Sequence, residues 1–195
     1  MLQAIANIGT AFGLASSAGL NAYIPLLIVS LAARFPLDDP FLTLAEPYSI
    51  LGSWWAIGII SVLLIVEMTV DKIPAVDTIN DIIHTLVRPA AGAILFAANS
   101  NVITDIHPAL ALAAGLLLAG GVHAAKGTTR PLVTATTGGS GNWFVSLLED
   151  IVAFFLSLFA ILLPILAGLL SIGLIILVIL LYHRYKQRRR KMVPT

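Results

Sequence analysis

The chain has 195 residues, of which 58% are hydrophobic and 11% are charged, and its formal net charge is +1. Soluble domains carry roughly 25% charged residues, so this sequence has too few polar groups to cover a soluble globule. The composition favours a polytopic all-α membrane protein, because helices satisfy their own backbone inside a bilayer. The absence of cysteine excludes disulfides and thiolate metal sites.

The first apolar segment covers about residues 4–33 and begins without the basic stretch of a secretory leader, so no leader is expected. Asn21 and Pro25 lie in its middle. A proline removes a backbone hydrogen bond, and a nearby asparagine eases local unwinding, so this segment is predicted to be a kinked or broken helix. Residues 34–51, rich in proline and acidic side chains, are predicted to form a loop.

Five further membrane spans are predicted downstream, and Pro89 is a predicted kink in one of them. The uncharged run of residues 151–182 would be about 48 Å long as one helix, so it is expected to break near Pro164. Residues 126–142 are too polar to face lipid as a helix and predict a loop or a re-entrant segment. The five spans cover about residues 52–70, 74–98, 109–125, 142–163 and 166–186.

Charge distribution predicts the orientation. The C-terminal tail, residues 184–195, is strongly basic, and the positive-inside rule places it in the cytoplasm. Counting back through six spans places the N-terminus there too. The tail is interpreted as a topology determinant that also contacts anionic lipids, and it does not support a nucleic-acid role.

The sequence contains an internal match. Residues 11–22 align with residues 113–124, and aromatic pairs at 54–55 and 143–144 open the spans that follow. This predicts two three-helix repeats, at about 4–98 and 107–186, with interrupted first helices. Because three is odd, the second copy would be inverted, an arrangement common in transporters. Alternatively, a duplication simply built a stable bundle.

Several motifs carry a resemblance to a known family. They are Gly19-Leu-Asn-Ala-Tyr-Ile-Pro-Leu-Leu, Glu67-x-x-x-Asp71-Lys72-Ile-Pro74-x-Val-Asp77, Arg88-Pro-Ala-Ala-Gly92, His123-Ala-x-Lys126-x-x-x-Arg130 and Gly138-Gly-x-Gly-Asn142-x-x-x-Ser146-Leu-x-Glu149-Asp150. Together they span nearly the whole chain and resemble the bacterial integral-membrane family catalogued as domain of unknown function 4126. The resemblance implies a multi-pass protein of the bacterial inner membrane and implies no activity.

The ionisable groups are expected to gather in the cytoplasmic half of the bundle. Charges at membrane depth are costly, so they should face inward and pair, which predicts a polar cavity open to the cytoplasm. Cations and helix N-termini suit an anion, whereas carboxylates and histidines suit proton or cation coupling. The candidate substrate-binding residues are Asn21, Arg88, His123, Lys126, Arg130 and Asn142. The candidate coupling network comprises Glu67, Asp71, Lys72, Asp77, Asp81, His84, Glu149 and Asp150.

The leading functional hypothesis is a small inner-membrane transporter or channel-like protein for a small, anionic solute or a lipid headgroup. One alternative is a membrane-embedded lipid-headgroup enzyme with His84 or His123 as general base. Another is a non-catalytic scaffold in which ion pairs, such as Glu149 with Arg130, fix packing. No cofactor, metal site or catalytic residue is assigned. The expected partners are membrane lipids and a small solute or ion, and Gly/Ala-rich helix faces are compatible with a homo-oligomer.

Overall fold

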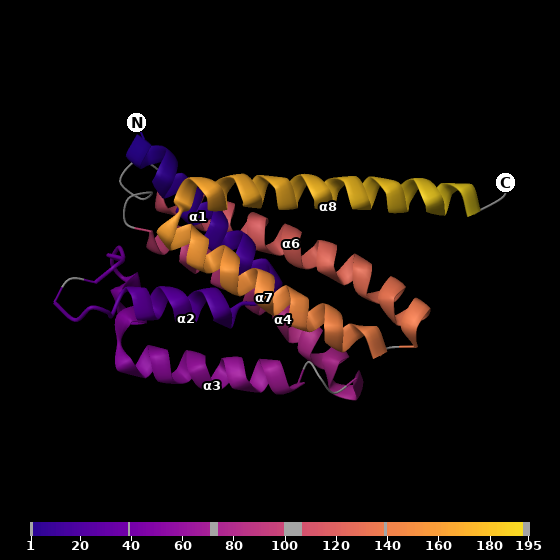
Figure 1. Cartoon of the computed structure of the whole chain (residues 1–195), viewed down its shortest axis with the longest axis horizontal. Helices are drawn as coiled ribbons and strands as arrows, with labels where there is room; N and C mark the ends of the chain where they lie inside the picture. The colour runs from indigo at the N-terminus through magenta and orange to yellow at the C-terminus, as the bar shows by residue number, and fades with distance from the viewer. Residues whose placement is uncertain (1, 39, 71–73, 100–106, 139, 193–195) are drawn as a thin grey trace.

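The computed structural model describes residues 2–38, 40–70, 74–99, 107–138 and 140–192 (Figure 1). Side chains are described for these residues except at 2–3, 74–82, 129–132, 140, 178 and 181–192. The helices are α1 (Leu2–Leu20), α2 (Tyr23–Ala32), the 3-10 helix η1 (Tyr48–Gly52), α3 (Trp54–Val70), α4 (Pro74–Ala98), α6 (Pro108–Thr137), α7 (Ser140–Leu162) and α8 (Pro164–Met192). Within the described ranges there is no strand, so the all-helical class expected from the composition is confirmed for this part of the chain.

Helix α1 is the centre of the bundle and packs against α4, α6, α7 and α8. Glycine permits this close approach. A Cβ added at Gly13 would lie 2.8 Å from Ala160 Cβ, and one added at Gly19 would lie 2.6 Å from the carbonyl oxygen of Ala119. Small residues let helix backbones approach closely, which is a common way of packing apolar helices.

The predicted break in the first apolar segment is confirmed at Asn21. Helix α1 ends at Leu20 and α2 begins at Tyr23. Asn21 is 1% exposed, and its Oδ1 accepts hydrogen bonds from the backbone N–H groups of Tyr23 at 3.0 Å and Ile24 at 3.1 Å. A buried asparagine therefore caps the first turn of α2 and satisfies donors that have no partner within the helix.

The direction of α2 differs from the prediction. Asn99, which follows α4, donates from Nδ2 to the carbonyl oxygen of Asn7 and forms a β-bridge with Leu44. Close by in sequence, Leu42 donates from its backbone N–H to the carbonyl oxygen of Ala32. The start of α1 and the end of α2 therefore lie at the same end of the bundle. The first apolar segment is a helical hairpin, so counting it as one kinked span was wrong.

The prediction of a loop or re-entrant segment over residues 126–142 was also wrong. Helix α6 continues to Thr137 and stops at Gly138, whose φ of +62° is the left-handed conformation typical of a helix C-terminus. Its threonines bond back to their own helix: Thr128 donates to Ala125, and Thr137 donates to Val133. Polarity makes this stretch unsuited to lipid, but it does not prevent helix formation. The interruption expected in the second repeat is therefore absent from α6.

The two matched segments run in the same direction. Ala11 and Ala15, in the middle of α1, share an apolar cluster with Ala111, near the start of α6. Further along both helices, Gly19 lies against Ala119. An inverted repeat requires these helices to be antiparallel, so the predicted inversion is not observed. The seven α-helices of the described residues run back and forth, and the start of α1 and the end of α8 lie at opposite ends of the bundle (Figure 1).

The remaining elements agree with the sequence. Helices α3 and α4 match the predicted spans, Pro89 lies within α4, and the break between α7 and α8 falls at Pro164. Many large apolar side chains on α3, α6, α7 and α8 are exposed, including Trp55 at 84% and Leu117 at 71%. Among the described residues, two helices, Pro108–Thr137 and Gly141–Leu162, are long and apolar enough by length and composition to cross a membrane.

Candidate functional site

Three polar side chains gather in the interior around Arg88, which is fully buried on α4. Its Nη2 lies 3.1 Å from Glu67 Oε1 on α3, and its Nη1 lies 3.1 Å from His123 Nδ1 on α6. His84, one turn before Arg88 on α4, places Nε2 3.5 Å from the same Glu67 oxygen. We refer to Glu67, His84, Arg88 and His123 as the Arg88 cluster.

Helix geometry explains how the Arg88 cluster forms. His84 and Arg88 are four residues apart and therefore share one face of α4. The carboxylate of Glu67 is buried on α3, where an isolated charge would be costly, and the guanidinium offsets that cost through a charge-assisted hydrogen bond. The ring of Tyr23, at the start of α2, packs edge-on against the imidazole of His84, and the two ring centroids are 5.8 Å apart. The cluster thus joins α3, α4 and α6 to the tip of the α1–α2 hairpin.

The hydrogen bonds assign the tautomer of His123. A guanidinium has donors and no acceptor, so Arg88 Nη1 donates and His123 Nδ1 accepts. The ring proton then lies on Nε2, which donates to Thr85 Oγ1 at 3.3 Å. His123 is therefore neutral in this arrangement, and its protonation would require the Arg88 contact to break.

A second group surrounds the end of α1. Lys126 on α6 is 6% exposed, and its Nζ lies 2.8 Å from Glu149 Oε2 on α7 and 3.4 Å from the carbonyl oxygen of Leu20. Asn21 donates from Nδ2 to Asp150 Oδ1 at 2.9 Å. We refer to Asn21, Lys126, Glu149 and Asp150 as the hairpin-tip cluster. It fixes the tip of the α1–α2 hairpin to α6 and α7.

The structure brings together eight of the residues expected from sequence, in these two clusters. Asn142 lies apart, where its side chain bonds that of Thr134 on α6. Tyr23, which packs against His84 of the Arg88 cluster, is a neighbour that sequence reasoning missed; its position two residues after the helix-breaking Asn21 was the available signal. Asp71 and Lys72 lie outside the described residues, and so do the side chains of Asp77, Asp81 and Arg130.

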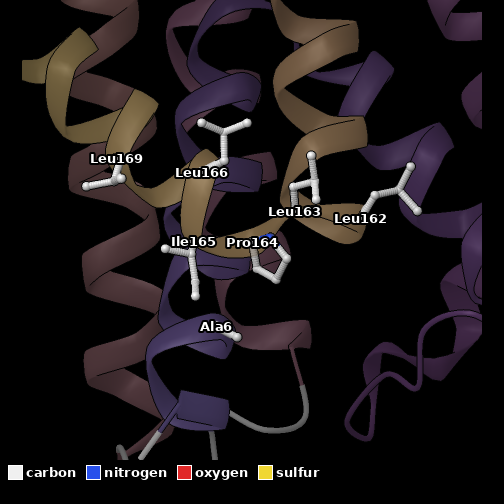
Figure 2. Close-up of a pocket in the computed structure, with 7 residues that line it drawn as sticks. All are labelled: Ala6, Leu162, Leu163, Pro164, Ile165, Leu166 and Leu169. Carbon is white, nitrogen blue, oxygen red and sulfur yellow. The ribbon is translucent and has the colours of Figure 1, made fainter.

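Three of the larger cavities in the described part of the structure are apolar and lie at the surface. One of 530 Å³ is formed at the corner between α7 and α8, where Pro164 and Ile165 lie beside Ala6 of α1 and Leu163 also lines the cavity (Figure 2). Others of 470 Å³ and 180 Å³ lie between α7 and α8 and between α1 and α8. None of the three is lined by a member of either cluster. Among the described residues, no group of three or more His, Asp or Glu side chains is arranged to hold a metal ion.

A family model described as "Domain of unknown function (DUF4126)" matches residues 8–184. The chain therefore belongs to this family, as the motifs around Asn21, Glu67, Arg88 and Lys126 suggested. No curated protein and no solved structure matches it.

Proposed function

We propose that the protein is an integral protein of the bacterial inner membrane that carries a small anion across the bilayer together with protons. The observation that carries the proposal is the Arg88 cluster: a fully buried guanidinium bonded to one carboxylate and one neutral histidine. Ionisable groups inside membrane-spanning helices are expensive to insert and typically mark the path of a substrate or proton.

The exposed apolar surface supports the membrane part of this proposal. Large hydrophobic side chains surround the bundle on α3, α6, α7 and α8, while the charged side chains of both clusters face inward. In Figure 1 the basic end of α8 and the end of α6 both point toward the right. By the positive-inside rule this end is the cytoplasmic one, and the N-terminus lies on the opposite side.

Competition for Arg88 supplies the coupling. An anion that takes the Nη2 donor of Arg88 competes with the Glu67 carboxylate, which is 3.1 Å away. Protonation of Glu67 weakens that ion pair and frees donors on Arg88. Anion and proton therefore favour each other's binding, and linkage requires the effect to be reciprocal. The break at Asn21 places an interrupted helix beside the cluster, as in many carriers.

The decisive experiment compares anion binding at two pH values. The purified protein is unfolded thermally in detergent with phosphate, sulfate, acetate or chloride, at pH 6 and at pH 8. At least one anion is expected to raise the melting temperature more at pH 6. In Glu67→Gln, which mimics the protonated acid, the stabilisation should persist and lose its pH dependence, and in Arg88→Gln it should vanish.

Glu46→Gln is the matched control, because Glu46 lies exposed in the loop before η1 and bonds Ser49. It should behave as the parent does. The anion that stabilises is then offered to proteoliposomes under an inward proton gradient, and uptake is expected to require Arg88. If no anion stabilises the parent at either pH, anion carriage is excluded for the compounds tested.

A second candidate function is a membrane scaffold, and the pairing of charges favours it. Glu67 pairs with Arg88, Lys126 pairs with Glu149, and Asp150 accepts from Asn21. Such pairs fix helix packing without any ligand. In that case Arg88→Gln lowers the melting temperature, and no anion changes it in any variant.

A further inference from the structure

The end of α1 carries a local excess of negative charge. The last carbonyl groups of a helix have no partner within it, and the helix dipole adds a partial negative charge there. Glu149 and Asp150 on α7 lie beside this end of α1. Asp150 accepts a hydrogen bond from Asn21, and Glu149 pairs with Lys126, whose ammonium group also bonds the carbonyl oxygen of Leu20. A cation placed among these oxygen atoms is therefore stabilised, since buried charges are normally paired.

Lys126 supplies that cation by helical spacing. Ala119 and Val122 of α6 pack against Gly19, and Lys126 follows them on the same face. Its side chain thus reaches the point where the backbone of α1 and the carboxylate of Glu149 meet. Lys126 is only 6% exposed. Its ammonium group lies 3.4 Å from the carbonyl oxygen of Leu20 and 2.8 Å from Oε2 of Glu149.

Carbonyl oxygens at the end of an interrupted helix, together with a carboxylate, are the ligands with which broken-helix carriers hold Na⁺. We propose that the end of α1 is a monovalent-cation site that the protein fills with its own lysine ammonium. The inference goes beyond the proposed function and does not rest on it, since the site is defined by cation binding alone. The ligand of the vacated site is an alkali cation, Na⁺ or K⁺.

The test removes the tethered charge and asks whether a free ion replaces it. Lys126→Met keeps most of the apolar stem and deletes the ammonium. Its melting temperature in detergent is measured in three buffers that contain about 150 mM of NaCl, KCl or choline chloride, so that the ionic strength and the anion stay constant. We expect Na⁺ or K⁺ to raise the melting temperature of Lys126→Met by about 3 °C or more relative to choline.

Two variants make the assignment specific. Lys126→Arg keeps a tethered cation, so it should show no difference between Na⁺, K⁺ and choline. The double variant Lys126→Met/Glu149→Gln also removes the negative charge of the Glu149 carboxylate. Its melting temperature should no longer rise in Na⁺ or K⁺ relative to choline. A folded Lys126→Met protein that melts at the same temperature in all three salts overturns the proposal.

The parent provides a readout that does not depend on any variant folding. Because its site is filled, its melting temperature should be the same in NaCl, KCl and choline chloride. An alkali-cation shift in the parent that is as large as the one expected in Lys126→Met would mean that Lys126 does not occupy the site. Anion effects at Arg88 are tested with the cation held constant, so failure here and failure of the proposed function are separate results.

Discussion

At the scale of single residues, Arg88 is expected to contribute most to the stability of the buried polar interior. Removing one partner of a buried ion pair leaves the other charged and unpaired, which costs about 3–5 kcal/mol, whereas removing both can be nearly neutral. We therefore expect Arg88→Ala to lower stability strongly and Arg88→Ala with Glu67→Ala to recover part of the loss. Melting temperatures of the two single variants and the double variant measure the coupling. Additive losses would show that the 3.1 Å contact contributes little.

Asn21 carries a second prediction at this scale. It caps α2 through Oδ1 and bonds Asp150 through Nδ2. Loss of a helix N-cap costs about 1 kcal/mol, and an unsatisfied buried partner adds to this. Asn21→Ala should therefore lower the melting temperature clearly more than Asn7→Ala, since the described bond at Asn7 uses its backbone oxygen. Equal effects of the two substitutions would argue against the capping role.

The residues of the interior were predictable from sequence, but their partners were not. The spacing of His84 and Arg88 on one helix face and the cost of charge in an apolar chain identified the polar groups. Glu149 was considered as a partner of Arg130, whose side chain lies outside the described residues, whereas its contact with Lys126 at 2.8 Å was not singled out from the sequence. Which charged residues pair depends on the axial position of each helix relative to its neighbour. That register is set by small residues such as Gly19, which carry no polar signal.

At the scale of elements, the crossing of α1 and α6 leads to a matched pair of glycine substitutions. A Cβ at Gly19 would lie 2.6 Å from Val122 Cβ, so Gly19→Ala must push the helices apart, and overpacking costs about 1–3 kcal/mol. Gly121 on the same α6 has no neighbour within 4 Å, so Gly121→Ala should be neutral or stabilise by up to about 1 kcal/mol. Thermal unfolding of both proteins checks this, and a Gly19→Ala variant as stable as Gly121→Ala contradicts it.

Helix α6 also shows where element prediction stops. Its polar last third was predicted as a loop because a lipid-facing helix cannot carry so many hydroxyl and charged groups. The helix nevertheless continues: Thr128 and Thr137 satisfy their hydroxyl groups on their own backbone, and the helix ends at Gly138 in the left-handed conformation. Hydropathy indicates which part of a sequence suits lipid, whereas capping residues indicate where a helix ends. A helix can therefore extend beyond its lipid-compatible part.

At the scale of the whole molecule, the topology depends on the reversal at Asn21. Length and hydropathy make residues 4–33 one span, and the same residues form the two antiparallel helices α1 and α2. Sequence patterns detect the break, but they do not give the angle between the two pieces. That angle is set by contacts with α4, such as the bond between Asn99 and Asn7. One reversal changes the side on which the N-terminus lies.

Cysteine labelling tests this topology directly, because the chain has no cysteine of its own. Single variants Gln3→Cys, Ser49→Cys and Lys191→Cys are treated in intact cells with a membrane-impermeant maleimide. The bonds of Asn99 with Asn7 and of Ala45 with Ala98 put the start of α1 and the loop that leads into η1, where Ser49 is exposed, at one end of the bundle. The basic end of α8 lies at the other end (Figure 1). With the basic end in the cytoplasm, Gln3→Cys and Ser49→Cys should react at once, and Lys191→Cys only after permeabilisation. Protection of Gln3→Cys together with Lys191→Cys would instead restore the arrangement in which both termini are cytoplasmic, and would require α1 and α2 to form one continuous crossing in the membrane.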